Sequence, residues 1–248
     1  MRTYLGMNPI GHKRVLTDPI MKTRPMDLLF SFAYKKEYDL LKNFPKVNLM
    51  IDSGAFTING QKPNINKAEK HAKEYMKFIL STKKDPRIKY YFDLDFYTLL
   101  SYDEVHEIRQ KLFELTPNII PIWHKQWGAR KFMAMCKEYN YIAIPCRLGM
   151  ELEKKGLINY VNYAHKNHCK IHGLGLTNVK VLDKVPFDSL DSMSWIQSAN
   201  FSYYGARRTY IQSDYVSENV EKVCKGTFLQ HLKQAEYYHN KWKWYHND

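Results

Sequence analysis

Short apolar runs recur along the chain with the spacing of strands that alternate with helices. Several of these runs are almost continuously apolar, as expected for parallel strands that are buried on both faces. The pattern predicts eight strands, at Arg2–Met7, Leu28–Tyr34, Val47–Asp52, Lys89–Asp93, Asn118–Trp123, Tyr141–Cys146, Lys170–Leu174 and Ser189–Met193.

Amphipathic stretches separate most of the predicted strands. Ser101 precedes Tyr102–Leu115 and is followed three residues later by Glu104, a spacing that predicts a capping box at the start of a helix. Along Asn66–Thr82 the apolar residues recur with the period of a helix. The remaining helices are predicted at Asn66–Thr82, Gly128–Tyr139, Glu151–Asn167 and, as one long helix or a pair of helices rich in basic and aromatic residues, Ser213–Asp248.

A strand and a helix that alternate about eight times favour an α/β fold of the (β/α)8 TIM-barrel type. The weak point is the first crossover, because Pro9–Pro25 shows no convincing helical pattern. An open, doubly wound sheet therefore stays as the alternative. We expect a single domain over residues 1–248, with the barrel at about 1–200 and a C-terminal helical extension at about 201–248.

Composition and charge narrow the class of protein. A hydrophobic content of 44% in 248 residues indicates a globular domain, and no segment has the length and apolar character of a membrane span or a secretion signal. The four cysteines are scattered, which argues against a disulfide framework or a cysteine zinc site, so we expect a cytoplasmic protein, in the host cytoplasm if it is phage-encoded. The net charge of +13 favours a polyanionic partner such as nucleic acid, although a lysine-rich proteome would give the same excess.

Polar side chains follow most of the predicted strands. In a barrel the carboxyl ends of the strands open onto one face, where active sites lie. A single aspartate there often caps the next helix, but several carboxylates at one mouth have no structural need to be together. The segments are Asp52-Ser53-Gly54-Ala55-Phe56, Asp93-Leu94-Asp95, His124-Lys125-Gln126, Cys146-Arg147, His172-Gly173-Leu174-Gly175 and Asp188-Ser189-Leu190-Asp191.

Four of these segments resemble, in order, motifs of the tRNA-guanine transglycosylases, which exchange guanine for a 7-deazaguanine. The chain carries IDSGAF, YFDLD, IHGLGLTN and DSLDSMSW. It looks most like the 7-deazaguanine DNA transglycosylases of phages and bacterial DNA-modification clusters. It lacks the cysteine zinc motif of the tRNA enzymes, carries Ala55 where the family has a second glycine, and has His124 nearest to the family's base-reading glutamine, with Gln126 two residues on.

The resemblance implies two catalytic aspartates. Asp191 would be the nucleophile that attacks C1′, and Asp52 the general acid and base. Asp188 is the rival nucleophile, but residues three apart on a strand point to opposite sides, so only one of the two should face the site.

The resemblance also implies a base pocket. Phe56 would stack on the purine, unless it is a core residue, and Asp93 would read the N1–H and amine edge. Asp95 is either the partner of Asp93 or a helix cap. The other expected base contacts are His124, Gln126, Cys146, Gly173 and Gly175.

The expected partners are DNA, with tRNA as the alternative, and a free 7-deazaguanine such as preQ0. Phosphate contacts are expected from Arg147, Arg207, Arg208 and the lysine-rich C-terminal segment, with stacking by Tyr203, Tyr204 and Tyr210, unless SYYGARRTY is an ordinary surface loop. We expect no membrane, metal or cofactor, since the spacing of His165, His168 and His172 matches no metal site and the first two fit solvent-facing helix positions. A non-catalytic binding barrel and a hydrolytic barrel remain as alternatives.

Overall fold

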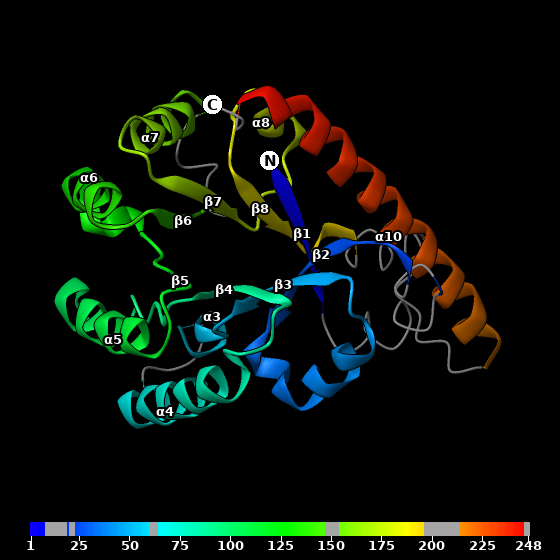
Figure 1. The fold of residues 1–248 in the computed structure, drawn as a ribbon, viewed down its shortest axis with the longest axis horizontal. Coiled ribbons are helices and arrows are strands. Elements are labelled where there is room, and N and C mark those ends of the chain that lie inside the picture. Colours follow the sequence, from blue (N-terminus) through cyan, green and yellow to red (C-terminus); the bar gives the residue numbers. More distant parts are fainter. Residues whose placement is uncertain (8–18, 20–22, 60–63, 147–153, 196–213, 246–248) are drawn as a thin grey trace.

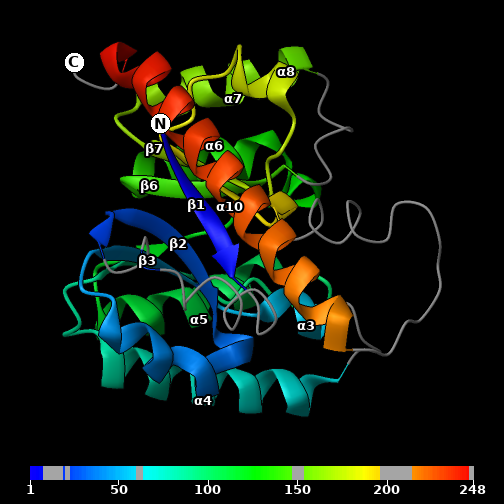
Figure 2. The same cartoon turned by 90° about the vertical axis from the view of Figure 1, so that its right-hand side faces the viewer.

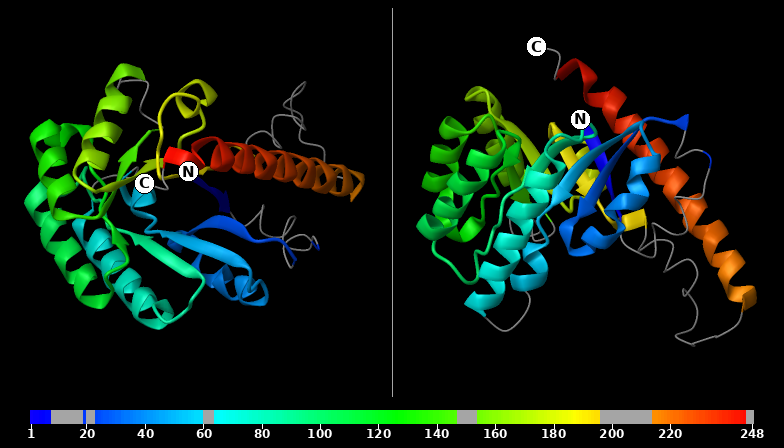
Figure 3. Two further views of the ribbon diagram at one scale, coloured as in Figure 1. Left: turned by 45° about the horizontal axis from the view of Figure 1, so that its top comes forward. Right: turned by 60° about the horizontal axis from the view of Figure 1, so that its bottom comes forward.

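The computed structural model is a (β/α)8 barrel with a long C-terminal helix packed outside it. It describes residues 1–7, 19, 23–59, 64–146, 154–195 and 214–245. Eight parallel strands follow one another in the order β5-β4-β3-β2-β1-β8-β7-β6, and an isolated parallel bridge from Ile122 to Ala143 joins the two edges. Figures 1 and 3 show the strands enclosed by helices. The doubly wound alternative is therefore wrong, and the barrel prediction is confirmed.

The strands lie close to their predicted positions. They are β1 (Arg2–Met7), β2 (Met26–Ser31), β3 (Val47–Asp52), β4 (Ile88–Phe92), β5 (Ile119–Ile120), β6 (Tyr141–Pro145), β7 (Lys170–Leu174) and β8 (Ser189–Ser192). Two differ most from prediction. β5 is much shorter, and β2 ends at Ser31, whose hydroxyl caps a 3-10 helix by accepting a hydrogen bond from the Ala33 amide.

The helices surround the strands. They are η1 (Phe32–Asn43), α3 (Ala55–Asn59), α4 (Ile65–Thr82), α5 (Tyr102–Leu115), η2 (Lys125–Trp127), α6 (Gly128–Glu138), α7 (Lys154–Lys166), α8 (Val179–Leu182), α10 (Asp214–Trp242) and η3 (Lys243–Tyr245). The predicted capping box of α5 is present, with Ser101 and Glu104 each bonded to the other's backbone amide. In the described part of the chain no helix is long and apolar enough to cross a membrane.

Helix α10 covers the outside of β1. Figure 2 shows it in front of β1, with its C-terminal end beside the N-terminus of the chain. Its apolar face enters the core through Phe228 and Leu232, and the ring of Phe228 lies 5.1 Å from that of Trp195. Over its described residues the predicted C-terminal extension is thus one long helix, α10, followed by η3. Most of the first crossover, 8–18 and 20–22, lies outside the described residues.

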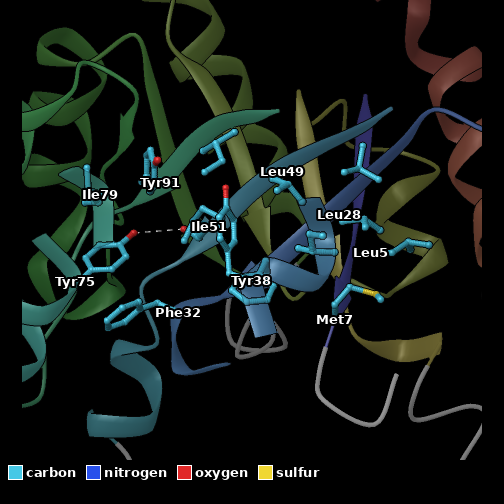
Figure 4. Packing of buried hydrophobic residues seen from close by; sticks show 14 of the residues in the cluster. Leu5, Met7, Leu28, Phe32, Tyr38, Leu49, Ile51, Tyr75, Ile79 and Tyr91 are labelled. Carbon is cyan, nitrogen blue, oxygen red and sulfur yellow. Dashed lines mark hydrogen bonds between the residues drawn. The ribbon is translucent and has the colours of Figure 1, made fainter. Parts of the chain in front are cut away.

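The core has two parts because strand residues alternate between the two faces of the sheet. Outward residues such as Leu28, Leu49 and Ile51 pack against the helices, and Figure 4 shows this layer, with the Tyr75 hydroxyl of α4 bonded to the Ile51 carbonyl. Inward residues fill the barrel, among them Tyr4, Leu29, Met50, Phe92 and Ala143.

The register decides which polar groups share this interior. Asp191 lies beside Tyr4 in the β1–β8 pair, and His172 beside Ala143 in the β6–β7 pair. Asp52 is two residues beyond Met50 on β3 and therefore points the same way. All three side chains consequently face the axis of the barrel.

Candidate active site

Asp52 stands at the carboxyl end of β3, at the mouth of the barrel. The Ser31 hydroxyl and the Gly54 amide donate hydrogen bonds to its carboxylate. Gly54 has a φ of 73°, a left-handed conformation that lets the chain turn back over the strand end. Burial raises the pKa of Asp52, and the negative charge of Asp191 raises it further.

Asp191 enters the mouth from β8, on the other side of β1 and β2. Its side chain is buried, and its Oδ1 accepts hydrogen bonds from the Gly175 amide at 3.0 Å and from His172 Nε2 at 3.1 Å. Gly175 has a φ of 65°, a left-handed conformation that favours glycine. Two N–H donors from the end of β7 thus fix one oxygen of this aspartate.

Asp188 occupies the opposite end of the barrel. It precedes β8, and its Oδ2 accepts a hydrogen bond from the Ile171 amide at 2.7 Å and lies 2.8 Å from His165 Nε2. The two candidate nucleophiles therefore have separate surroundings, and only Asp191 is beside Asp52. The expectation that His165 faces solvent is wrong, because its side chain packs between Asp188 and Tyr245.

Asp93 and Asp95 differ although they are two residues apart. Asp93 is fully buried, with Oδ2 at 2.6 Å from Arg109 Nε and Oδ1 accepting from the Ile122 amide. Both of its oxygens are engaged within the protein, so it is withdrawn from the mouth. Asp95 is the member of the pair that the structure brings to the site, and the cap of α5 is Ser101 instead.

Asp95 forms a pair with His124. Its Oδ2 lies 2.7 Å from His124 Nε2. Burial raises the pKa of Asp95, His124 lowers it, and the charge of Asp52 raises it. Tyr97 stacks on the imidazole of His124 at 3.8 Å, and Gln126 donates to the Tyr97 carbonyl from η2. Asp95 and His124 therefore border the same mouth as Asp52.

Phe56 is exposed over 67% of its surface, at the start of α3. The alternative that it is a core residue is therefore wrong. An exposed ring directly after Asp52-Ser53-Gly54-Ala55 is available to stack on a flat ligand.

Cys146 and Gly173 pack together below the rim. Burial raises the pKa of the Cys146 thiol, and the charge of Asp191 adds to this effect. A Cβ on Gly173 would lie 3.3 Å from Leu176 and Phe187 and 3.4 Å from Cys146 Sγ. Gly173 is thus tightly packed, and of the two predicted glycines it is Gly175 that contacts a candidate catalytic group.

The structure describes only part of the segments predicted to contact nucleic acid. Arg147, Arg207 and Arg208, with Tyr203, Tyr204 and Tyr210, lie outside the described residues. The end of the chain is described: Trp242 is buried and donates to the Leu182 carbonyl, while Trp244 is exposed. Tyr245 contacts His165. This end of α10 therefore lies at the far end of the barrel from Asp191.

His172 belongs to one of the strand-end segments, but no role in the site was predicted for it from the sequence. It sits in the middle of an apolar strand, and the register, in which it lies beside Ala143 and Ser189, places it inside the barrel. The signal available in the sequence was a histidine inside an apolar strand, next to the strand that carries the candidate nucleophile. Among the described residues, no group of three or more His, Cys, Asp or Glu side chains is arranged to hold a metal ion.

No family model matches the chain, and no curated protein matches it. The chain is similar to a crystal structure from Coccidioides immitis described as a "putative fructose-1,6-biphosphate aldolase", with 10% identity and a TM-score of 0.58 over 95% of this chain and 89% of that one. At this identity the likeness bears on the fold alone. The class that fold and comparison define is the (β/α)8-barrel proteins, whose active sites lie at the carboxyl ends of the strands.

Proposed function

We propose that this protein is a base-exchange enzyme that replaces guanine in DNA by a 7-deazaguanine such as preQ0. The observation that carries the proposal is the pair of carboxylates, Asp52 and Asp191, at one barrel mouth. Their charges interact, and the pKa of Asp52 is raised. Exchange at C1′ with retention needs one carboxylate that attacks and a second group that handles protons, and unequal environments separate these roles.

In the first displacement Asp191 attacks C1′ of the target nucleotide. The bond from C1′ to guanine N9 breaks, and the departing base takes the proton of Asp52. A raised pKa suits Asp52 to this step because it keeps the carboxylic acid form available nearer neutral pH. The product is a sugar esterified to Asp191, with Asp52 now ionised.

In the second displacement the incoming 7-deazaguanine gives its N9 proton to the Asp52 carboxylate. Its N9 forms a bond to C1′, and the bond from C1′ to Asp191 breaks. Both aspartates return to their starting states, so the cycle needs no metal, cofactor or external proton. Water in place of the base would give hydrolysis, which is the chemistry of the competing hydrolytic barrel.

We assign recognition of the base to Asp95, His124 and Phe56. A carboxylate accepts two adjacent N–H donors, such as N1–H and the exocyclic amine of guanine, and Asp95 borders Asp52 at the mouth. Asp93 is left out of this assignment because Arg109 and the Ile122 amide engage both of its oxygens. The exposed ring of Phe56 would cover one face of the base.

The polymer is assigned from charge and from the resemblance. A net charge of +13 favours a polyanion, and the chain lacks the cysteine zinc motif of the tRNA-modifying enzymes that it resembles. In a duplex the bond from C1′ to N9 is stacked inside the helix, so the target nucleotide would be flipped out or unpaired.

The test is incubation of the protein with preQ0 and guanine-containing DNA or, separately, tRNA, followed by mass spectrometry of the nucleosides. Deazaguanosine in DNA with the wild type, and none with Asp191→Asn, is the expected result. Deazaguanosine in tRNA alone would correct the polymer. Abasic sites without incorporation would replace base exchange by hydrolysis, and DNA binding without either product would favour the non-catalytic barrel.

A further inference from the structure

A line of buried polar side chains runs inside the barrel beneath Asp191. His172, fully buried on β7, faces Asp191 Oδ1 with Nε2 and the Ser189 hydroxyl with Nδ1. The Tyr141 hydroxyl of β6 is hydrogen-bonded to the same Ser189 oxygen. Three adjacent strands thus contribute a continuous chain of hydrogen bonds that ends on the candidate nucleophile.

If Asp191 is ionised and His172 is neutral, the direction of every hydrogen bond in the chain follows. An ionised Asp191 only accepts, so His172 Nε2 carries the hydrogen. In a neutral imidazole Nδ1 then accepts, and Ser189 donates to it. The Ser189 oxygen is left to accept from Tyr141, whose pKa is raised far above its usual range by burial, so that its hydroxyl keeps its proton. All donors therefore point toward Asp191.

We propose that His172 is the positioning residue of the nucleophile, held as the neutral Nε2–H tautomer by Ser189 and Tyr141. This inference rests on the proposed base exchange. The Gly175 amide and His172 both bind Oδ1 of Asp191. They orient the carboxylate so that Oδ2 is the oxygen that attacks C1′.

The two displacements depend on His172 to different extents. In the first, Oδ2 forms its bond to C1′ and Oδ1 becomes the carbonyl oxygen of the ester, while N9 of guanine departs with the proton of Asp52. In the second, the bond from Oδ2 to C1′ breaks and negative charge returns to the carboxylate. Donors on Oδ1 stabilise that charge, so their loss slows the second displacement more than the first.

The experiment compares His172→Met, which removes the donor, with His172→Gln, which keeps one near the position of Nε2. Loss of a single such donor should lower kcat about 10- to 100-fold. With His172→Met we expect a protein–DNA adduct, stable on a denaturing gel, to accumulate after guanine release, with KM for preQ0 nearly unchanged. His172→Gln should restore most of the exchange rate.

The matched control is His165→Gln, which alters the other aspartate–histidine pair, at the far end of the barrel, and should leave exchange unchanged. Ser189→Ala is a milder variant in case His172→Met does not fold. It removes the donor to Nδ1 and should give partial adduct accumulation. Wild-type exchange rates in both His172→Met and Ser189→Ala, or an equal loss of both displacements without rescue by His172→Gln, would overturn the proposal.

A readout on the free protein separates this inference from the proposed function. Nitrogen-15 NMR of the imidazoles should show His172 as the neutral Nε2–H tautomer at neutral pH, and a tautomer mixture in Ser189→Ala. An imidazolium or an Nδ1–H tautomer in the wild type would refute the positioning role whatever the reaction is. The expected tautomer in a protein that exchanges no base would instead count against the proposed function alone.

Discussion

The carboxylates at the two ends of the barrel differ in their electrostatic surroundings. At the amino end two aspartates lie beside basic side chains: Asp188 beside His165, and Asp85, in the turn before β4, bound by Arg87 at 2.6 Å. Arg87 lowers the pKa of Asp85 to about 2. At the carboxyl end burial and the charge of Asp191 raise the pKa of Asp52, and burial and the charge of Asp52 raise the pKa of Asp95 although His124 lies beside it.

This difference separates stability from chemistry within one fold. An aspartate whose pKa is lowered stabilises the folded state when it is ionised, whereas one whose pKa is raised destabilises it. The unfavourable interactions of Asp52 with Asp191 and with Asp95 thus lie at the mouth, which is where enzymes of this architecture react with their substrates. Functional sites are often the places where a fold departs from its most stable arrangement.

The largest difference between the two ends should come from the substitutions Asp191→Asn and Asp188→Asn. Loss of the nucleophile should reduce base exchange by on the order of 10⁴-fold or more. Asp188→Asn should leave exchange within a few-fold of wild type and reduce the free energy of unfolding by about 1 kcal/mol, since it weakens a buried hydrogen bond. Exchange rates measure the loss of activity, and urea denaturation measures the loss of stability. Equal losses of activity in the two variants would contradict the proposed difference between the two ends.

Asp52→Asn should produce the next largest effect, about 10²- to 10⁴-fold, because it removes the general acid and base. In the wild type, guanine release needs protonated Asp52. Its single-turnover rate should therefore be highest below the raised pKa of Asp52 and should fall as the pH rises through it. Capture of the incoming base needs the ionised form and should show the opposite dependence. A pH profile of guanine release that is the same in Asp52→Asn as in the wild type would exclude this role.

Phe56→Ala and Trp244→Ala compare two aromatic side chains that are each 67% exposed, at the mouth and at the far end. Stacking of a base on an aromatic ring contributes about 1–3 kcal/mol, so Phe56→Ala should raise KM about 10-fold or more with little change in kcat. Trp244→Ala should change neither. Steady-state kinetics over preQ0 concentration provide the measurement, and equal effects of the two substitutions would refute a role specific to the mouth.

Asp85→Asn should give the smallest effect, confined to stability. Because the folded-state pKa of Asp85 is about 2, below its ordinary 3.8, its stabilisation is complete above that ordinary value and is lost as the pH falls toward 2. We expect a loss of about 1 kcal/mol at neutral pH, after allowance for solvent screening, and almost none near pH 2. Urea denaturation at several pH values tests this, and a loss independent of pH would assign the effect to packing.

The sequence predicted the barrel well because parallel strands buried on both faces are distinct from their surroundings. It misplaced the end of β2, since Phe30 to Tyr34 are apolar except for Ser31, and the cap by Ser31 starts a helix there. It extended β5 too far for a related reason. Ile122 and Trp123 are apolar and buried although they lie beyond the end of β5, and a buried apolar residue need not belong to a strand.

The strand ends and the family resemblance predicted part of the candidate site. Asp52 and Asp191 follow from both. The separation of Asp93 from Asp95 does not, because it depends on Arg109, sixteen residues along on α5, reaching Asp93 through the packed layer. The inward orientation of His172 and its bond to Asp191 do not follow either, because both require the register of β7 with its neighbours.

Helix α10 has a consequence for the order in which the barrel assembles. Strand β1 pairs with β8 and is covered by α10, so two of its three neighbouring elements come from the far end of the sequence. During synthesis at about 5–20 residues per second, β1 waits on the order of 10 to 50 seconds for these partners. Contacts so distant in sequence slow folding, and until they form, one edge of β1 has unpaired backbone groups. The last step of folding is therefore expected to be the docking of α10, which closes the seam between the first strand and the eighth.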